Sequence, residues 1–448
     1  MKKSKKFVLA GLALLAITMV LLPLAGCKND SVPPEVEKQE QGDGGGSETD
    51  KNNTAAKLVS ITVTPPERTV YSMGQEFDST GMVVTATYDD GEERTVTGTI
   101  TTDTGTLTQS AGIGKTVTVS YTEGDTTKEA TFTVDVASYQ FTETVQDVDS
   151  SYTGTMTGGT YKKFGDWPQT IKEEGVEIGA GTLVRGGLTY HVGSDGNYYV
   201  KAEEKANGTG TQYKYSNGDQ VGQGGTSTKW FKVEPIVWRV LTESYNSTNH
   251  ALLLAESILT GGIKWADSKN DYMESNIRKW LNGNSGTGEN SDYSGTPGFL
   301  QTAFTADAQK LIADTTVDNS AASTNPASNP KQWAEGENPY ASDTPTRDKV
   351  FLLSEKEATT ESYGFATYSD SGKGNTRIRV TTDYAKATGA YQSSTEGYGG
   401  WWWLRSPYCN GESSARVINY NGGAYSNNFV SSTNGGVVPA LSISLGGN

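Results

Sequence analysis

Short runs that alternate apolar and polar residues, separated by turns, constrain the first third of this chain most strongly. They recur between residues 57 and 136, for example from Met82 to Tyr88, ahead of Asp89-Asp90-Gly91. Thr and Val dominate the runs, which suits half-buried strands, and Asp-Gly is a strong hairpin signal. About seven such strands within about 80 residues predict a β-sandwich.

The segment 57–136 resembles the group 3 bacterial immunoglobulin-like (Ig-like) domains of surface proteins. The matching residues are Ile61-Thr62-Val63, Tyr71 with Gly74 and Phe77, Val83 to Tyr88 with Asp90-Gly91, and Val117-Thr118-Val119-Ser120-Tyr121. The resemblance implies a spacer or adhesive module, and no residue in the segment looks catalytic.

Composition excludes several classes of protein. The chain has 448 residues, which predicts two or three domains. Its 53 glycines and 34% apolar residues disfavour a helical bundle and favour strands with long loops. A net charge of −15 disfavours a nucleic-acid partner. Two Cys and two His disfavour a disulfide framework, a Cys-rich zinc site and a His-based centre.

The N-terminus has the layout of a secretory signal. Lys2, Lys3, Lys5 and Lys6 precede an apolar run, and Leu24-Ala25-Gly26-Cys27 ends it. This resembles the lipobox of bacterial lipoproteins, which implies a signal peptide at 1–26, lipidation of Cys27 and a membrane partner through the lipid. The alternative is a plain transmembrane helix. Residues 27–56 are almost free of apolar side chains and are predicted to be a disordered tether.

A linker at 137–159 is predicted to lead into a large C-terminal domain at 160–448. Ile236–Leu241 and Ala251–Ala255 have buried-strand patterns with a turn between them, so we expect a hairpin. Ser275, Thr305 and Thr382 are expected to cap short helices, and Ser354 with Glu357 fits a capping box. The predicted fold class is therefore mainly β with some helix.

The C-terminal domain resembles a bacterial domain of unknown function that is common in surface lipoproteins. That family is similar to the C-type lectin fold shared with formylglycine-generating enzymes. The resemblance implies an α+β, C-type-lectin-like domain that follows the β-sandwich in the sequence. The matching features are Phe164-Gly165 with Pro168-Gln169, Trp238-Arg239-Val240-Leu241, Arg278 with Trp280-Leu281-Asn282, Ala303-Phe304-Thr305, Asp348 to Ser354, Tyr384-Ala385, Trp402 to Pro407 and Val438-Pro439-Ala440-Leu441.

The sequence does not favour an enzyme. Formylglycine-generating enzymes use a pair of cysteines, whereas the domain has only Cys409. His191 and His250 lie beside turn-like segments and are interpreted as surface residues. Adjacent carboxylates such as Glu203-Glu204 are expected to be solvated. No cofactor and no metal ion are predicted, because no carboxylate cluster has a calcium-loop spacing.

Residues 408–434 are rich in Asn, Ser and Tyr, the residue types with which antibody loops bind. The layout resembles the variable proteins of diversity-generating retroelements, which vary a C-terminal lectin-like surface. The alternative is an ordinary, undiversified loop, because Asn, Gly and Ser also dominate turns. The candidate ligand-binding residues are Tyr408, Asn410, Asn419, Tyr420, Asn421, Tyr425, Asn427 and Asn428.

The tryptophan run ahead of this segment is predicted to belong to the core. On a strand, either Trp402 or the pair Trp401 and Trp403 faces inward. Arg405 is expected to form a structural ion pair or to bond backbone carbonyls.

Taken together, the sequence predicts a lipid-anchored, surface-exposed bacterial protein of the cell envelope that binds a protein or glycan ligand, as an adhesin or recognition protein. The alternatives are an enzyme acting on surface glycans or peptides and a purely structural envelope lipoprotein.

Overall fold

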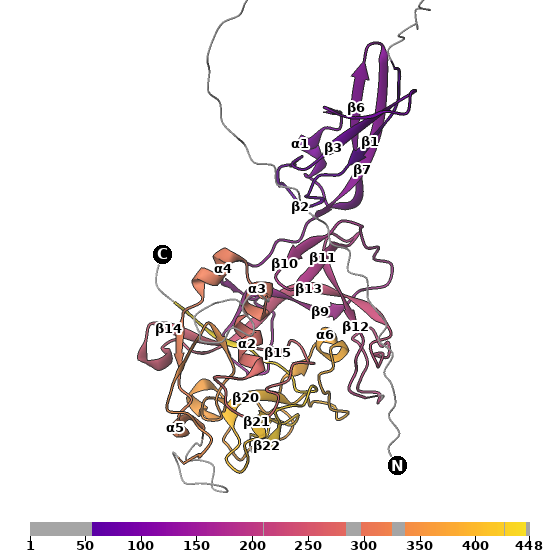
Figure 1. Cartoon of the computed structure of the whole chain (residues 1–448). Coiled ribbons are helices and arrows are strands. Elements are labelled where there is room, and N and C mark those ends of the chain that lie inside the picture. The colour runs from indigo at the N-terminus through magenta and orange to yellow at the C-terminus, as the bar shows by residue number, and fades with distance from the viewer. Residues whose placement is uncertain (1–55, 209, 284–296, 325–336, 425, 445–448) are drawn as a thin grey trace, which may run out of the picture. The chain divides into compact units, whose positions relative to one another are not determined.

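The structure is a computed structural model, and it describes residues 56–208, 210–283, 297–324, 337–424 and 426–444 (Figure 1). The predicted signal peptide, the lipidation site Cys27 and all of the predicted tether except Ala56 lie outside these residues. Strands account for 38% of the residues and helices for 11%, which confirms the mainly β fold class.

Residues 58–137 form two small sheets that face each other across a shared core. One sheet has the order β1-β3-β4 and the other the order β2-β7-β6-β5. Both sheets lie in the indigo part of Figure 1. The elements are β1 (Leu58–Thr64), β2 (Val70–Ser72), β3 (Val83–Tyr88), β4 (Glu93–Val96), β5 (Thr99–Ile100), α1 (Thr104–Leu107), β6 (Gly112–Glu123) and β7 (Thr126–Ala137).

The alternating pattern of these strands explains the sandwich. Val84, Ala86 and Tyr88 are buried on β3 while their neighbours are more exposed, because successive side chains point to opposite faces. Gly91 closes the turn between β3 and β4 at φ +82°, a conformation that glycine adopts without strain. The predicted strands and hairpin of this segment are thus present.

The rest of the described chain is built on a nine-stranded sheet. Seven strands follow the order β10-β11-β12-β13-β14-β23-β18, and β9 pairs with both β13 and β8. Gln146–Asp147, within the predicted linker, form β8. The other strands are β9 (Tyr161–Ile171), β10 (Leu183–Arg185), β11 (Leu188–Val192), β12 (Tyr198–Glu203), β13 (Thr228–Thr242), β14 (His250–Ala255), β18 (Val350–Phe351) and β23 (Ala440–Ser444).

Strand β13 organises this sheet because it is long enough to pair with three others. Its first part pairs with β12, its last part with β14, and β9 runs along most of its length. The hairpin of β13 and β14 confirms the one that the sequence predicts. The last strand, β23, lies between β14 and β18, so the end of the chain completes the sheet.

Smaller elements cover the sheet. The strand pairs are β15 (Ser257–Ile258) with β19 (Val380–Thr381) and β16 (Thr315–Val317) with β17 (Thr346–Asp348). The helices are α2 (Asn276–Asn282), α3 (Phe299–Ala303), α4 (Ala306–Leu311), α5 (Ala321–Thr324) and α6 (Asp383–Ala387), with 3₁₀ turns η1 (Tyr245–Ser247), η3 (Glu357–Thr359) and η4 (Glu361–Tyr363).

The predicted helix caps are present. The side chains of Ser275, Thr305 and Thr382 accept hydrogen bonds from the third residue of α2, α4 and α6. Ser354 and Glu357 form the reciprocal bonds of a capping box, but the box begins the short 3₁₀ turn η3 rather than an α-helix.

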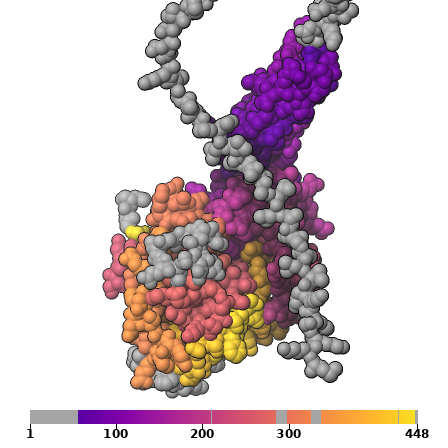
Figure 2. Space-filling model, in the orientation of Figure 1, coloured from indigo at the N-terminus to yellow at the C-terminus, as the bar shows by residue number. Residues whose placement is uncertain are grey.

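A separate sheet of three strands, which we call the terminal sheet, lies near the end of the chain. It consists of β20 (Trp402–Pro407), β21 (Ser414–Ile418) and β22 (Ser426–Phe429), in that order. Trp401, Trp402 and Trp403 are all buried. An alternating strand would bury only one face of this run, so the prediction was incomplete. Figure 2 shows residues from this yellow end of the chain on the surface.

Candidate functional site

The structure separates the predicted ligand-binding residues into groups at the two ends of the terminal sheet. Tyr408 and Asn410 lie in the loop after β20, and Asn428 on β22 pairs with Ala415 near that end. Asn419, Tyr420 and Asn421 lie in the turn between β21 and β22. Asn427 lies on β22 opposite Arg416. Tyr425 lies outside the described residues.

Several of these asparagines support the backbone locally. The Asn419 Oδ1 accepts a hydrogen bond from the Tyr420 backbone N–H at 2.9 Å, and the Asn421 Oδ1 accepts one from Gly423 at 3.1 Å. The Asn428 Oδ1 accepts from Phe429 at 2.8 Å. Asn410 and Asn427 have exposed side chains. Two of the five candidate asparagines are therefore placed to meet a ligand.

An exposed aromatic residue lies beside them. Phe429, at the end of β22, is 64% exposed. It was not among the predicted residues, which were chosen from the Asn and Tyr of the segment. A single exposed apolar side chain is common on protein surfaces, so Phe429 gains weight only from its position beside the exposed Asn427 on β22.

Asn270 holds the loop that carries Tyr408 and Asn410. Its side-chain N–H groups donate to the carbonyls of Gly411 and Ser414 at 2.9 and 2.7 Å, and more weakly to that of Tyr408 at 3.3 Å. Asn270 is only 3% exposed, so these bonds are shielded from water. Sequence reasoning missed this residue, since nothing in the local pattern around Asn270 indicates a partner so far along the chain.

Replacing Asn270 with alanine is expected to loosen this loop. The variant leaves up to three carbonyls without their donor, so the free energy of unfolding should fall by about 1–3 kcal/mol. Amide hydrogen exchange within 408–414 should speed up more than elsewhere. Asn427→Ala, at an exposed position of β22, is the control and should leave both measurements nearly unchanged. Equal exchange rates in wild type and Asn270→Ala would contradict the role of Asn270.

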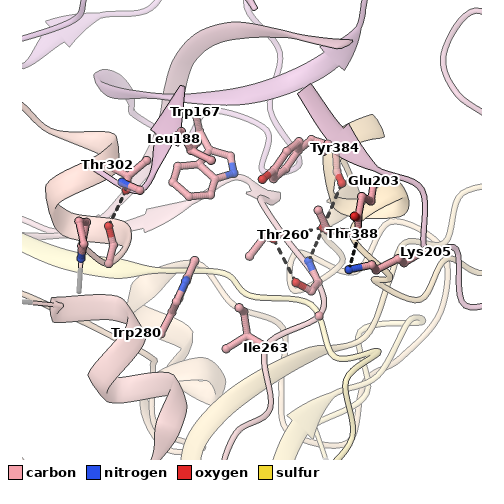
Figure 3. A pocket seen from close by; sticks show the side chains of 16 residues that line it. Trp167, Leu188, Glu203, Lys205, Thr260, Ile263, Trp280, Thr302, Tyr384 and Thr388 are labelled. Atoms are coloured by element: carbon pink, nitrogen blue, oxygen red, sulfur yellow. Dashed lines mark hydrogen bonds and ion pairs between the residues drawn. The ribbon is translucent and has the colours of Figure 1, made fainter. Parts of the chain in front are cut away.

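A second candidate site is a pocket that the sequence did not predict, which we call the tryptophan pocket (Figure 3). Its volume is about 410 Å³, within the range of small-molecule sites. None of the predicted ligand-binding residues lines it. Its described lining residues are Trp167, Gly187, Leu188, Ala202, Glu203, Lys205, Thr260, Gly261, Gly262, Ile263, Trp280, Pro297, Gly298, Thr302, Tyr384 and Thr388.

Two tryptophans from distant parts of the sequence meet in this pocket. Trp167 lies on β9, and its indole N–H donates to the Leu259 carbonyl at 3.0 Å, which fixes the ring. Trp280 lies on α2 and contacts Trp167 edge to face at 6.1 Å between centroids. Phe299 packs against both rings from behind. Trp280 remains only half-buried.

Helix α6 supplies the third aromatic ring. Tyr384 meets Trp167 edge to face at 6.1 Å. Asp383 fixes the helix, because its carboxylate accepts hydrogen bonds from the Ile171 backbone and from Ser216. Figure 3 shows the Tyr384 side chain pointing into the space beside Trp167. Burial raises the pKa of Tyr384 to about 12, so the hydroxyl stays protonated at neutral pH.

The Tyr384 hydroxyl is the group in the pocket that most clearly lacks a partner. The residue is only 7% exposed, yet its hydroxyl makes no hydrogen bond to any described residue. The indole N–H of Trp280 also has no partner among the described residues. Neither atom is among the described buried polar atoms that lack a partner, so each reaches open space, where it can bond a ligand or a water molecule.

A polar wall lies opposite the rings. The Thr388 hydroxyl accepts a hydrogen bond from the Gly261 N–H at 3.0 Å and contacts the Thr260 hydroxyl at 3.2 Å. Glu203 and Lys205 form an ion pair of 2.7 Å at the pocket, with both side chains more than half exposed. Among the described lining residues these two alone carry charge, so the described wall is neutral overall.

The neighbouring residue Glu204 contradicts the expectation that both Glu203 and Glu204 are solvated. Glu203 is exposed as predicted, but Glu204 is buried and not solvated. Its carboxylate accepts hydrogen bonds from the Tyr215 hydroxyl at 2.7 Å and the Gly222 N–H at 2.9 Å. Successive residues of an extended segment point to opposite sides, which explains why only one of the pair reaches solvent.

Comparisons with known protein families agree with part of the sequence interpretation. Residues 64–136 match the bacterial Ig-like domain (group 3), and residues 248–445 match a domain of unknown function, DUF6273. No curated protein matches the chain. The N-terminal segment is thus confirmed as a bacterial Ig-like domain, and the C-terminal match begins just before β14.

These matches define the class of the protein only coarsely. Group 3 Ig-like domains are typical of bacterial surface proteins, so the domain suggests a surface or binding role. In the described part of the chain, no helix has the length and apolar character needed to cross a membrane. Nor do any three His, Cys, Asp or Glu residues gather there in a way that suits a metal ion.

Proposed function

We propose that the protein is a lipid-anchored bacterial surface protein whose C-terminal, C-type-lectin-like domain binds a protein or glycan ligand without covalent chemistry. The Ig-like domain supports surface display, and the signal and lipobox pattern of residues 1–30 supports the lipid anchor. The observation that carries the binding role is the tryptophan pocket, with the Tyr384 hydroxyl, which bonds to no described residue, inside it.

The pocket favours binding over catalysis. Its two charged lining residues, Glu203 and Lys205, are paired with each other at 2.7 Å and lie largely in solvent. A general acid or base must lie within hydrogen-bond reach of the reacting group. Side chains that are paired with each other and lie largely in solvent are poorly placed for that role.

The terminal sheet offers a second candidate binding surface. Phe429, Asn427 and Asn410 all expose their side chains there, which supports the hypothesis of a diversified, retroelement-type surface. Deep sequencing of the gene's 3′ end in a clonal population tests it. Changes concentrated at codons 408–434 would support diversification, and an invariant segment would contradict it.

The proposed function is tested by an unbiased screen. The purified protein is applied to immobilised glycans and surface proteins, with Trp280→Ala and Phe429→Ala in parallel. We expect retention of the wild type on at least one ligand and a loss of at least about tenfold in affinity for Trp280→Ala. No retention on any ligand, or release of a chemically altered ligand, would contradict non-covalent recognition.

A further inference from the structure

We propose that the tryptophan pocket binds one ring of a neutral saccharide, with a face of the sugar against Trp280. The inference rests on the proposed function and names the ligand class of its site. It depends on three features of the pocket: the arrangement of its rings, its unpartnered polar groups and its charge.

The rings form an apolar corner that suits a sugar ring. Trp280 and Tyr384 each meet Trp167 at nearly a right angle, with interplanar angles of 88° and 87°. Trp280 is half-buried, and the side chain of Ile263 lies beside it in the pocket. The C–H groups on one face of a pyranose are apolar, so an aromatic surface desolvates that face at little cost, while the hydroxyls at its edge need polar partners.

The pocket provides such partners around the apolar corner. Tyr384 and Trp280 both have polar hydrogens without partners among the described residues. The hydroxyls of Thr260 and Thr388 lie on the opposite wall. The Thr388 hydroxyl is already engaged with the Gly261 N–H and the Tyr384 carbonyl. The Thr260 hydroxyl, in contrast, can still accept a hydrogen bond. A flat apolar ligand would leave these groups unsatisfied, whereas a ring with several hydroxyls would bond them.

The charge of the pocket selects a neutral ligand. A cage for a quaternary ammonium needs aromatic faces without a competing cation, but Lys205 lines this pocket beside Glu203. A phosphate or other anion would meet Glu203 and a chain of net charge −15. A neutral ligand suits the Glu203–Lys205 pair, because the Glu203 carboxylate can accept hydrogen bonds from its hydroxyls and the Lys205 ammonium can donate to them.

The size of the pocket fits a terminal ring rather than a long chain. Its volume of about 410 Å³ lies near the lower end of the range for small-molecule sites. Two glycines, Gly261 and Gly262, form part of its lining, and a side chain at either would collide with the backbone of residues 388–390. The space therefore depends on these two positions remaining glycine.

The test is titration of the full-length protein with glucose, galactose, N-acetylglucosamine and their disaccharides, followed by calorimetry and tryptophan fluorescence. We expect binding of at least one of these sugars with a change in fluorescence. Tyr384→Phe removes only the hydroxyl and should weaken binding about tenfold or less, in line with one lost hydrogen bond. Trp280→Ala should weaken it more than tenfold, while Leu311→Ala, at an exposed apolar residue of α4 that belongs to neither candidate site, should leave it unchanged. Phe429→Ala is measured in parallel to test the terminal sheet.

Choline and inorganic phosphate are titrated as controls. Failure of every sugar to bind would overturn the saccharide assignment, whether or not choline or phosphate binds. The proposed function would then still stand if a protein ligand from the screen depends on Trp280. Sugar binding that is lost in Phe429→Ala and kept in Trp280→Ala would overturn the pocket as its site. Trp280→Phe, which keeps an aromatic ring, should retain part of the affinity and shows that the loss in Trp280→Ala is not caused by unfolding.

Discussion

Replacing Arg405 with alanine is expected to lower the free energy of unfolding of the C-terminal region by about 3–5 kcal/mol. Arg405 is only 2% exposed. Its guanidinium forms an ion pair with Glu357 and donates to the carbonyls of Leu352 and Asp318 at 2.9 and 3.0 Å. The substitution leaves the Glu357 carboxylate inside the protein without its cation. This uncompensated charge accounts for most of the expected loss in the free energy of unfolding. Denaturant unfolding measures the change.

The dependence of this effect on pH separates charge from packing. Burial alone would raise the pKa of Glu357, but the charge and hydrogen bonds of Arg405, with those of Tyr245 and Ser354, lower it below its ordinary value. The stabilisation is thus present above the carboxyl's unfolded pKa and is lost as pH falls through the folded one. The difference between Arg405→Ala and wild type should shrink below about pH 4.

Arg347 provides the matched control. It is an arginine on β17 with an exposed side chain, and Arg347→Ala should change stability by less than about 0.5 kcal/mol. A small, pH-independent effect of Arg405→Ala would show that Arg405 is not the structural residue described above.

Trp402→Phe is expected to destabilise the protein by about 2–4 kcal/mol, and Trp403→Phe by at least about 1 kcal/mol less. Both side chains are fully buried, so the change in volume is the same. The Trp402 indole N–H donates to the Arg377 carbonyl at 3.1 Å, whereas the Trp403 indole N–H is buried and has no hydrogen-bond partner among the residues that the structure describes.

Thermal and denaturant unfolding of the two variants side by side checks this difference. In Trp402→Phe the Arg377 carbonyl loses its hydrogen-bond donor. In Trp403→Phe the substitution removes an indole N–H whose burial without a bond destabilises the folded state. Equal destabilisation by the two substitutions would contradict the assigned hydrogen-bond pattern.

The sequence predicted local structure well, because local rules decide it. The strands of the Ig-like domain follow from alternation of apolar and polar residues, and the caps at Ser275, Thr305 and Thr382 from residue type alone. The hairpin of β13 and β14 follows from two apolar runs with a turn between them. Where tertiary packing overrides alternation, the prediction was less complete, as for the run Trp401–Trp403, which is buried throughout.

The tryptophan pocket could not be predicted from the sequence, because residues from distant segments of the chain form it. Trp280 belongs to one of the matching family motifs and Trp167 lies between the residues of another. Nothing in the local pattern of either shows that β9 and α2 bring the two side chains together. The sequence also does not show which aromatic side chain remains exposed to solvent in the folded protein. Phe429 was missed for the same reason, since its exposure depends on β22 having no neighbour beyond it in the terminal sheet.

Radical footprinting with and without the ligand recovered from the screen tests the central claim most directly. The method reports loss of exposure at individual aromatic side chains, and the two candidate sites carry one informative residue each, Trp280 and Phe429. Our account predicts that the ligand protects Trp280 and leaves Phe429 as reactive as before. Protection of Phe429 and its neighbours, with Trp280 unchanged, would contradict it and would assign recognition to the terminal sheet.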